Sequence, residues 1–136
     1  MCMTTKRSEG RMTKEKFETA YIDFLKTALA LAAKARKESI LGLKADIDPQ
    51  KAAQRDILHY GLKFAVDATA GEIIDTIITN IRDQEKDEWQ WKLKTIQKQT
   101  VLAILDGLGA EPLRPLLNSF THLSIKEEDR RMGNEK

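Results

Sequence analysis

Cysteine, long apolar runs and aromatic residues are scarce in this chain of 136 residues. Its single cysteine, Cys2, cannot form an internal disulfide, so we expect a reducing compartment and a cytoplasmic location. The longest run of purely apolar residues covers only residues 28–33, whereas a membrane-spanning helix needs about 20 such residues. We therefore expect no membrane span.

Patterns typical of β-strands are also missing. Aromatic residues make up 6% of the chain, and no segment alternates apolar and polar residues over several positions as a half-buried strand does. Ala, Leu, Lys, Glu, Gln and Ile dominate instead, and most of these are good helix formers. The composition therefore predicts an all-α protein.

Neither sign of charge is in large excess. The chain has 23 basic and 21 acidic side chains, a net charge of +2, and the two signs are mixed along the sequence. A nucleic-acid-binding protein usually concentrates positive charge on one face, but here the densest internal basic cluster, 34–37, is followed at once by Glu38. We expect no nucleic-acid partner. A basic adaptor remains an alternative, and its binding would weaken steeply with salt.

Residues typical of catalysis or metal binding are sparse. The two histidines, His59 and His122, are far apart in sequence, and the only cysteine lies in the N-terminal segment. A structural metal site needs about four ligands. There is no Gly-rich phosphate loop, nucleophile elbow or paired Ser/His or Cys/His. We therefore predict no catalytic residue, metal or cofactor.

Apolar residues recur at spacings of three and four, the pattern of amphipathic helices. We expect a first helix from Thr13 to about residues 42–45 and a second helix after Pro49. A third helix should run over 72–106, because no glycine or proline interrupts that span, and a short last helix should start near Pro112. A turn near Asp87 is the alternative to one continuous third helix.

These segments predict a small bundle of about four helices, with the two long ones packed antiparallel. Residues 1–12 and 124–136 are polar and lack periodicity, so we expect two disordered tails around one domain over 13–123. The predicted core is Phe17, Phe24, Leu58, Leu62, Val66, Ile74, Ile77, Ile81, Val101, Leu105 and Leu117.

Two segments 39 residues apart repeat one pattern. They cover residues 62–74 and 101–113. In each, an apolar stretch ends at an Asp, a short break of small residues follows, and a Glu opens a new apolar stretch. We interpret each copy as a helix end followed by a new helix start. In the first copy, Thr69 and Glu72 have the spacing of a capping box. Capping and the helix dipole account for the repeated acids without a catalytic role.

Three segments, taken in order, resemble a known family. They are residues 33–49 (AKARKESILGLKADIDP), 56–78 and 99–120. Each is similar to a cytoplasmic segment of the flagellar motor stator subunit MotA family, and the resemblance covers about residues 14–121. The family has one pair of membrane helices before the first segment and a second pair between the last two. This chain lacks the first pair, and the polar stretch 83–93 stands in place of the second.

The resemblance implies a non-enzymatic, soluble protein–protein interaction module without ion-channel activity. Its partner would be the rotor switch protein or another motor or envelope component. The family engages that partner through charged residues on its cytoplasmic helix. The basic one corresponds to Arg36, whereas Lys44 stands where the family has an acid, which reverses the charge. The oligomeric state does not carry over from the family, and a homo-oligomer stays open.

We predict five partner-binding residues. Arg36, Lys37 and Lys44 would form a basic docking edge, because positions eight apart share one face of a helix. Trp89 and Trp91 point to different sides of a helix, so at least one should be exposed, and Trp is enriched at interface hot spots. The alternatives are a solvated helix face for the basic residues and the edge of the core for the tryptophans. A helical small-ligand binder or enzyme is the alternative function.

Overall fold

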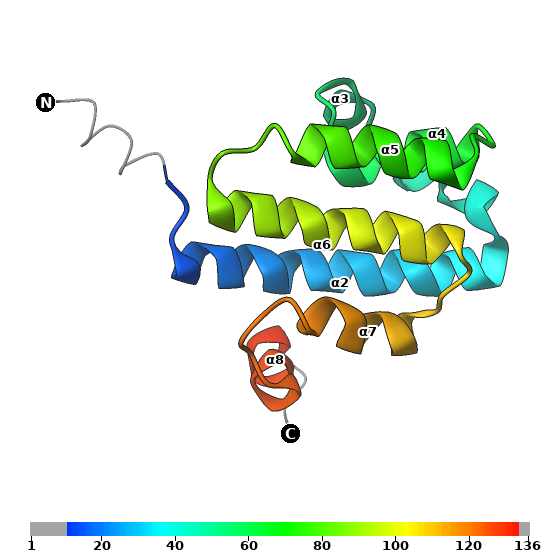
Figure 1. Cartoon of the computed structure of the whole chain (residues 1–136). Helices are drawn as coiled ribbons and strands as arrows, with labels where there is room; N and C mark the ends of the chain where they lie inside the picture. The colour runs from blue at the N-terminus through cyan, green and yellow to red at the C-terminus, as the bar shows by residue number, and fades with distance from the viewer. Residues whose placement is uncertain (1–10, 134–136) are drawn as a thin grey trace, which may run out of the picture.

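The structure is a computed structural model that describes residues 11–133. Within that range the chain forms seven α-helices and one 3-10 helix, with no strand (Figure 1). They are α2 (Lys14–Glu38), η1 (Ile40–Asp46), α3 (Pro49–Ala53), α4 (Ile57–Val66), α5 (Gly71–Arg82), α6 (Glu88–Leu105), α7 (Ala110–Asn118) and α8 (Ile125–Met132). The all-α prediction is confirmed. The bundle uses more and shorter helices than the four expected.

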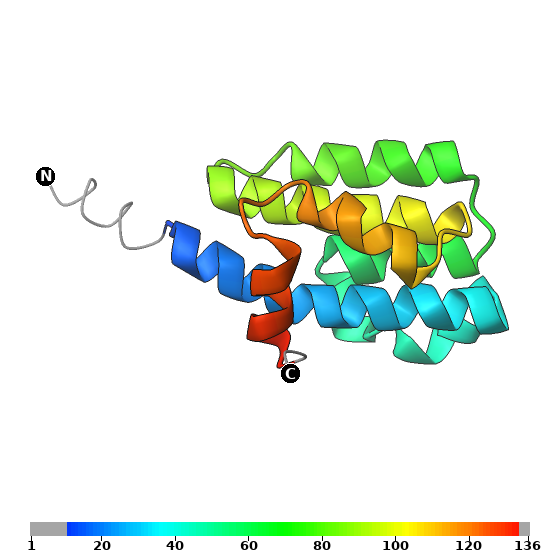
Figure 2. The same cartoon turned by 90° about the horizontal axis from the view of Figure 1, so that it is seen from below.

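The two longest helices, α2 and α6, lie side by side at the centre of the bundle (Figure 1). Helices α4 and α5 pack on α6 from one side, and the short helix α3 packs against α4. On the other side, α7 packs on α2 and α6, and α8 crosses α2 (Figure 2). Among the described helices, none is both long enough and apolar enough for a membrane span.

The central pair runs parallel, so the predicted antiparallel pair is wrong. Near the two N-terminal ends, the rings of Phe17 and Trp89 lie 5.0 Å apart. At the two C-terminal ends, Nη1 of Arg36 donates a hydrogen bond of 2.8 Å to the carbonyl of Gly107. The direction follows from the turn between α5 and α6: α5 runs antiparallel to α6, so α6 returns in the direction of α2 (Figure 1).

That turn also shows that the predicted continuous helix over 72–106 is wrong and that the alternative turn near Asp87 is correct. Asp87 is the N-cap of α6, and its Oδ1 accepts hydrogen bonds from the backbone N–H groups of Trp89 (2.9 Å) and Gln90 (3.1 Å). Its other oxygen accepts from the N–H of Met12 at 2.7 Å. Although burial raises the pKa of Asp87, these N–H donors lower it more, so the net pKa is below its usual value. A side-chain cap therefore starts the helix without glycine or proline.

The first helix is shorter than expected because it ends at Glu38. Ser39 follows with a φ of 73°, in the left-handed region, and its N–H bonds the carbonyl of Ala35 at 2.8 Å. The chain then continues as the 3-10 helix η1. A Cβ at Gly42 would lie 2.7 Å from the Cβ of Glu38, so this tight reversal requires glycine there.

The start of α5 differs from the predicted capping box. Ala70, not Thr69, is the N-cap, and no side chain bonds to the first turn. The helix begins at Gly71, one residue later than a Thr69 cap predicts. Glu72 still lies in the first turn, where its charge favours the positive end of the helix dipole. The charge position was predicted correctly, but the capping bond was not.

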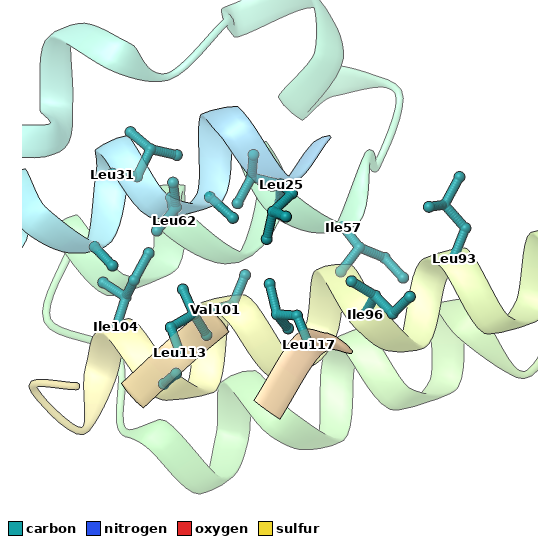
Figure 3. Packing of buried hydrophobic residues seen from close by; sticks show 14 of the residues in the cluster. Leu25, Leu31, Ile57, Leu62, Leu93, Ile96, Val101, Ile104, Leu113 and Leu117 are labelled. Carbon is teal, nitrogen blue, oxygen red and sulfur yellow. The ribbon is translucent and has the colours of Figure 1, made fainter. Parts of the chain in front are cut away.

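One apolar core joins all the longer helices (Figure 3). Six predicted core residues are buried: Phe17, Leu58, Leu62, Ile74, Val101 and Leu117. Phe24, Val66, Ile77, Ile81 and Leu105 are only partly buried. Helices α4 and α6 approach closely at Gly61, where an added Cβ would lie 3.0 Å from a methyl group of Val101.

The C-terminal segment corrects the prediction of a disordered tail over 124–136. Its described part forms α8, which begins after Ser124, whose hydroxyl accepts from the N–H of Glu127 at 3.0 Å. The helix ends at Gly133, a left-handed residue with a φ of 79°. Most of the other predicted tail, residues 1–10 of 1–12, lies outside the described residues.

Candidate functional site

Three turns gather at one end of the bundle, the right-hand end of Figure 1. They are the turn from α2 into η1, the turn from α4 into α5 and the turn from α6 into α7. The last two are the repeated helix ends of the sequence, and the first belongs to the segment 33–49. Parts of all three segments that resemble the stator family therefore meet in space.

The α2–α6 groove lies at this end and has a volume of about 460 Å³. Its lining comes from the end of α2, from η1 and from the end of α6 with the residues after it. The lining residues are Ala35, Arg36, Ser39, Ile40, Leu41, Ile104, Leu105, Gly107 and Leu108. Leu41 is 68% exposed, and it has the largest exposure of any large hydrophobic side chain in the described chain. The groove is thus apolar and bordered by an uncovered leucine.

Arg36 is fixed at the rim of this groove. Besides its bond to the carbonyl of Gly107, its side chain runs along Gly109, where an added Cβ would lie 3.6 Å from Cγ of Arg36. The cation lies at the C-terminal end of α6, where the helix dipole favours positive charge. None of the ion pairs within residues 11–133 involves Arg36. The guanidinium is therefore held in place by backbone contacts and has no carboxylate partner in the described chain.

Lys44 does not share a helix face with Arg36, because α2 ends at Glu38 and Lys44 lies on η1. It instead lines the η1–α4 groove, of about 340 Å³, together with Lys63. The other lining residues are Ile47, Pro49, Ala52, Ala53, Val66 and Asp67. Lys37 and Lys44 are exposed and take part in no ion pair of the described residues. The three basic residues lie at one end of the bundle, but they do not form one continuous edge.

The two tryptophans lie at the other end of α6 and differ from each other. Trp89 packs against Phe17 in the core, and the ammonium of Lys92 lies 5.5 Å from its ring centre. Trp91 is exposed, and its Nε1 donates to Asp83 at 3.3 Å. The guanidinium of Arg82 lies 4.3 Å from the Trp91 ring centre, within range of a cation–π contact. The expected split between the tryptophans is present, with Trp89 at the core edge and Trp91 at the surface.

A buried polar cluster escaped the sequence prediction. Glu128 of α8 is fully buried. Its Oε1 accepts from Nε of Arg114 at 3.1 Å, and its Oε2 accepts from Nδ2 of Asn118 at 2.7 Å and from the hydroxyl of Tyr21. We call these four residues the Glu128 cluster. The spacing from Ser124 to Glu127 is a capping-box signal that marks this helix in the sequence.

Charge and burial shift two groups of the Glu128 cluster. Burial raises the pKa of Tyr21 well above its usual value, and the hydrogen bond and charge of Glu128 raise it further. Burial alone would lower the pKa of Arg114, but hydrogen bonds to Asp129 and Glu128 outweigh this effect and raise it. Tyr21 therefore stays neutral and keeps its hydroxyl proton, and Arg114 stays positively charged. Both can donate hydrogen bonds to the side chain of Glu128.

No set of three or more His, Cys, Asp and Glu side chains suited to a metal ion occurs in the described part of the chain. His59 has a local role: its Nδ1 accepts the backbone N–H of Asp48 at 3.0 Å. This bond ties the N-cap of α3 to α4. The α2–α6 groove and the η1–α4 groove are two mainly apolar places in the described chain with room for a bound molecule or an apolar side chain of a partner.

The fold and the grooves define an all-α bundle with apolar, basic-rimmed surfaces at one end. Comparison with known proteins gives no matching family model, no matching curated protein and no matching solved structure. The relationship to the stator family stays a prediction that rests on the three sequence segments.

Proposed function

We propose that the chain is a non-enzymatic protein–protein interaction module that binds a partner protein at the α2–α6 groove. The observation that supports this most is Leu41, 68% exposed beside an apolar groove. Binding sites are typically concave and lined mainly by apolar side chains, and the α2–α6 groove with Leu41 at its border has these features.

Arg36 supports a partner that carries a carboxylate next to an apolar side chain. An arginine whose conformation is already fixed loses less side-chain entropy when it binds, and its planar group can bind a carboxylate through two parallel hydrogen bonds. Arginine is also frequent at interface hot spots. The apolar groove would bury the partner's side chain while Arg36 selects the charge beside it. Lys37, which is exposed and follows Arg36 in sequence, would add attraction near the groove, which affects association rate more than affinity.

The resemblance to the MotA family supports a partner among flagellar motor or envelope proteins, with the rotor switch protein as the first candidate. The segment 33–49 contains both Arg36 and Leu41, so the resemblance and the groove support the same surface. Lys44 departs from the family in the sign of its charge. A partner that fits the family's acidic position would therefore bind this chain less well.

Affinity purification from cell lysate at low salt, followed by mass spectrometry, tests this function. We expect partner proteins that are retained by the wild-type chain and lost by Leu41→Glu. Ile73→Glu is the matched control, because Ile73 is 52% exposed on α5 and does not line the α2–α6 groove. Failure to recover any motor or envelope protein argues against the proposed class of partner. Equal recovery by Leu41→Glu and wild type argues against the groove.

A small-ligand binder is the second candidate, and the η1–α4 groove is the observation in its favour. Its volume of about 340 Å³ is within the range of ligand pockets, and its walls are mainly apolar. A screen of small molecules by NMR chemical shifts tests this candidate. Ligand-dependent shifts confined to residues around Ala52 and Val66 would favour it over the interaction module.

A further inference from the structure

The Glu128 cluster has the composition of a carboxylate-binding site whose occupant is the chain's own last helix. Three donors converge on one carboxylate, Tyr21 from α2 and Arg114 and Asn118 from α7. Tyr21 is itself fully buried. No buried side-chain polar atom of the described chain lacks a hydrogen-bond partner, so the site is fully satisfied while Glu128 fills it.

The site recognises two neighbouring acids. While Nε of Arg114 binds Glu128, its Nη2 donates to Oδ1 of Asp129 at 2.7 Å. One guanidinium therefore binds a Glu-Asp pair at consecutive helical positions. The fork of arginine suits this geometry, because its donors diverge in one plane.

The attachment of α8 combines a polar cluster with one apolar contact. Glu128 is its only fully buried residue, Ile125 is 41% exposed, and Met132 is partly buried against the core. Away from the cluster, Arg131 pairs with Glu18 of α2 at 3.4 Å. Elements held by few apolar contacts open locally at low free energy. Separation also returns the charges to water, so the desolvation that opposed docking is recovered. After separation, the polar groups of α8 and those of α2 and α7 that bonded Glu128 can form hydrogen bonds with water, as in transient interfaces.

We infer that Tyr21, Arg114 and Asn118 form a receptor for an acidic helix of a partner protein, and that α8 occupies this receptor in the free chain. A partner helix with a Glu-Asp pair would displace α8 and take its place. Charge complementarity identifies the occupant, since the receptor offers a cation, an amide and a hydroxyl to one carboxylate. This receptor is built from α2 and α7 and shares no lining residue with the α2–α6 groove. It does not depend on the proposed function.

Hydrogen exchange of the full chain tests whether α8 opens on its own. We expect the amides of α8 to exchange about tenfold or more faster than those in the middle of α6, as a local opening requires. Equal protection of α8 and α6 would overturn the inference, because α8 would then open only with the whole bundle.

Peptide binding tests the receptor itself. The probe is a fluorescent peptide of residues 122–133, added to the full-length chain, to Glu128→Gln and to Asp129→Asn. We expect about tenfold tighter binding to the two variants than to wild type, because each weakens the competing contact made by α8. Asp129→Asn leaves Glu128 in place, so it remains informative if Glu128→Gln fails to fold.

Altered peptides and one chain variant provide the controls. A peptide with Glu128→Gln should lose binding, whereas a peptide with the exposed Lys126 changed to Gln should keep it. Leu41→Glu in the chain should bind the peptide normally even where it loses groove partners, which separates this receptor from the proposed function. Absence of peptide binding to both variants overturns the inference. Self-association of the variants in place of peptide binding would reassign the receptor to a second copy of this chain.

Discussion

The helix end after α4 and the helix end after α6 have the same backbone and different residues at the strained position. Helix α4 ends at Val66 and α6 at Leu105, and the next helices begin at Gly71 and Ala110, so both boundaries repeat at 39 residues. The left-handed residue is Ala68 in the first copy, with a φ of 64°, and Gly107 in the second, with a φ of 78°.

The hydrogen bonds of the two copies also correspond. The N–H of Thr69 bonds the carbonyl of Phe64 at 3.0 Å, and the N–H of Leu108 bonds that of Ala103 at 2.9 Å. Both are the long bond of a Schellman motif, which satisfies carbonyls at a helix end. The second copy has a further contact, because its Gly107 carbonyl accepts from Arg36. Both helix ends therefore adopt the same backbone conformation, but only the second contacts the proposed binding surface, through the hydrogen bond from Arg36 to Gly107.

Leu62→Ala should have the largest effect of the changes that test this comparison. Leu62 opens the first copy and is fully buried, as is Val101 at the matching position of the second copy (Figure 3). Truncation should lower the free energy of unfolding by about 3 kcal/mol, through lost burial and a residual cavity. Urea unfolding followed by circular dichroism measures this change. Leu41→Ala is the control on an exposed leucine and should stay within about 0.5 kcal/mol of wild type. Similar losses for both would mean that Leu41 is covered in solution.

Gly107→Ala should be next in size. Space around Gly107 is open, since an added Cβ would meet no atom within 4 Å. The penalty is therefore one of backbone conformation, about 1–2 kcal/mol for a residue with a Cβ in the left-handed region. Urea unfolding should show a lower midpoint with an unchanged slope. An unchanged midpoint would indicate that the second helix end relaxes to another backbone conformation when glycine is removed.

The sequence predicts the two helix ends because their signal is local. An apolar stretch, an acid and small residues lie within a few positions, and each copy supports the other. The turn over 83–87 is harder to predict, since its helix start depends on one side chain, Asp87, and not on glycine or proline. The parallel direction of α2 and α6 depends on that turn, so one local error reverses the predicted packing of the two long helices.

The candidate site is less predictable than the fold because its contacts are long-range. Arg36 stands out as a charged residue in sequence, but its partner, the carbonyl of Gly107, lies 71 positions away. Composition also misled at α8: IKEEDRRM resembles a solvated tail, and its one buried acid depends on donors from two other helices. The N-cap Ser124 and the C-cap Gly133 are the local sequence signals that indicate a helix in this segment, although its composition is typical of a disordered tail.

Asp87→Ala should destabilise the turn between α5 and α6 and leave both repeated helix ends intact. Loss of the N-cap should cost about 1 kcal/mol at neutral pH. The pKa of Asp87 is lowered in the folded chain, so its contribution is complete above the pKa of an unfolded aspartate, about 3.9. That contribution is lost as the pH falls through the folded pKa. Neither repeated helix end is followed by a side-chain cap of this kind.

Asp87→Asn is the informative control, because asparagine caps as well as aspartate and carries no charge. It should keep the cap but lose the charge contribution and the bond to Met12, so its stability at neutral pH should lie between those of wild type and Asp87→Ala, with a weaker loss of stability in acid. Urea unfolding at pH values from about 3 to 7 measures both variants. An acid profile of Asp87→Asn identical to that of wild type would assign the pH dependence to Glu85, whose pKa is also lowered, chiefly by its hydrogen bond to Lys94.

Ala68→Gly should have the smallest effect and the opposite sign. Glycine removes the left-handed penalty of Ala68 but adds freedom to the unfolded chain, and the second effect is the smaller of the two. We expect a gain of about 0.5 kcal/mol, measured as a higher urea midpoint. Combined with Gly107→Ala, it exchanges the residues of the two helix ends, and additive effects are expected if the copies are independent. A loss of stability in Ala68→Gly would show that the methyl group of Ala68 makes a contact worth more than its backbone strain. The first helix end would then have its own side-chain support, as the second has in Arg36.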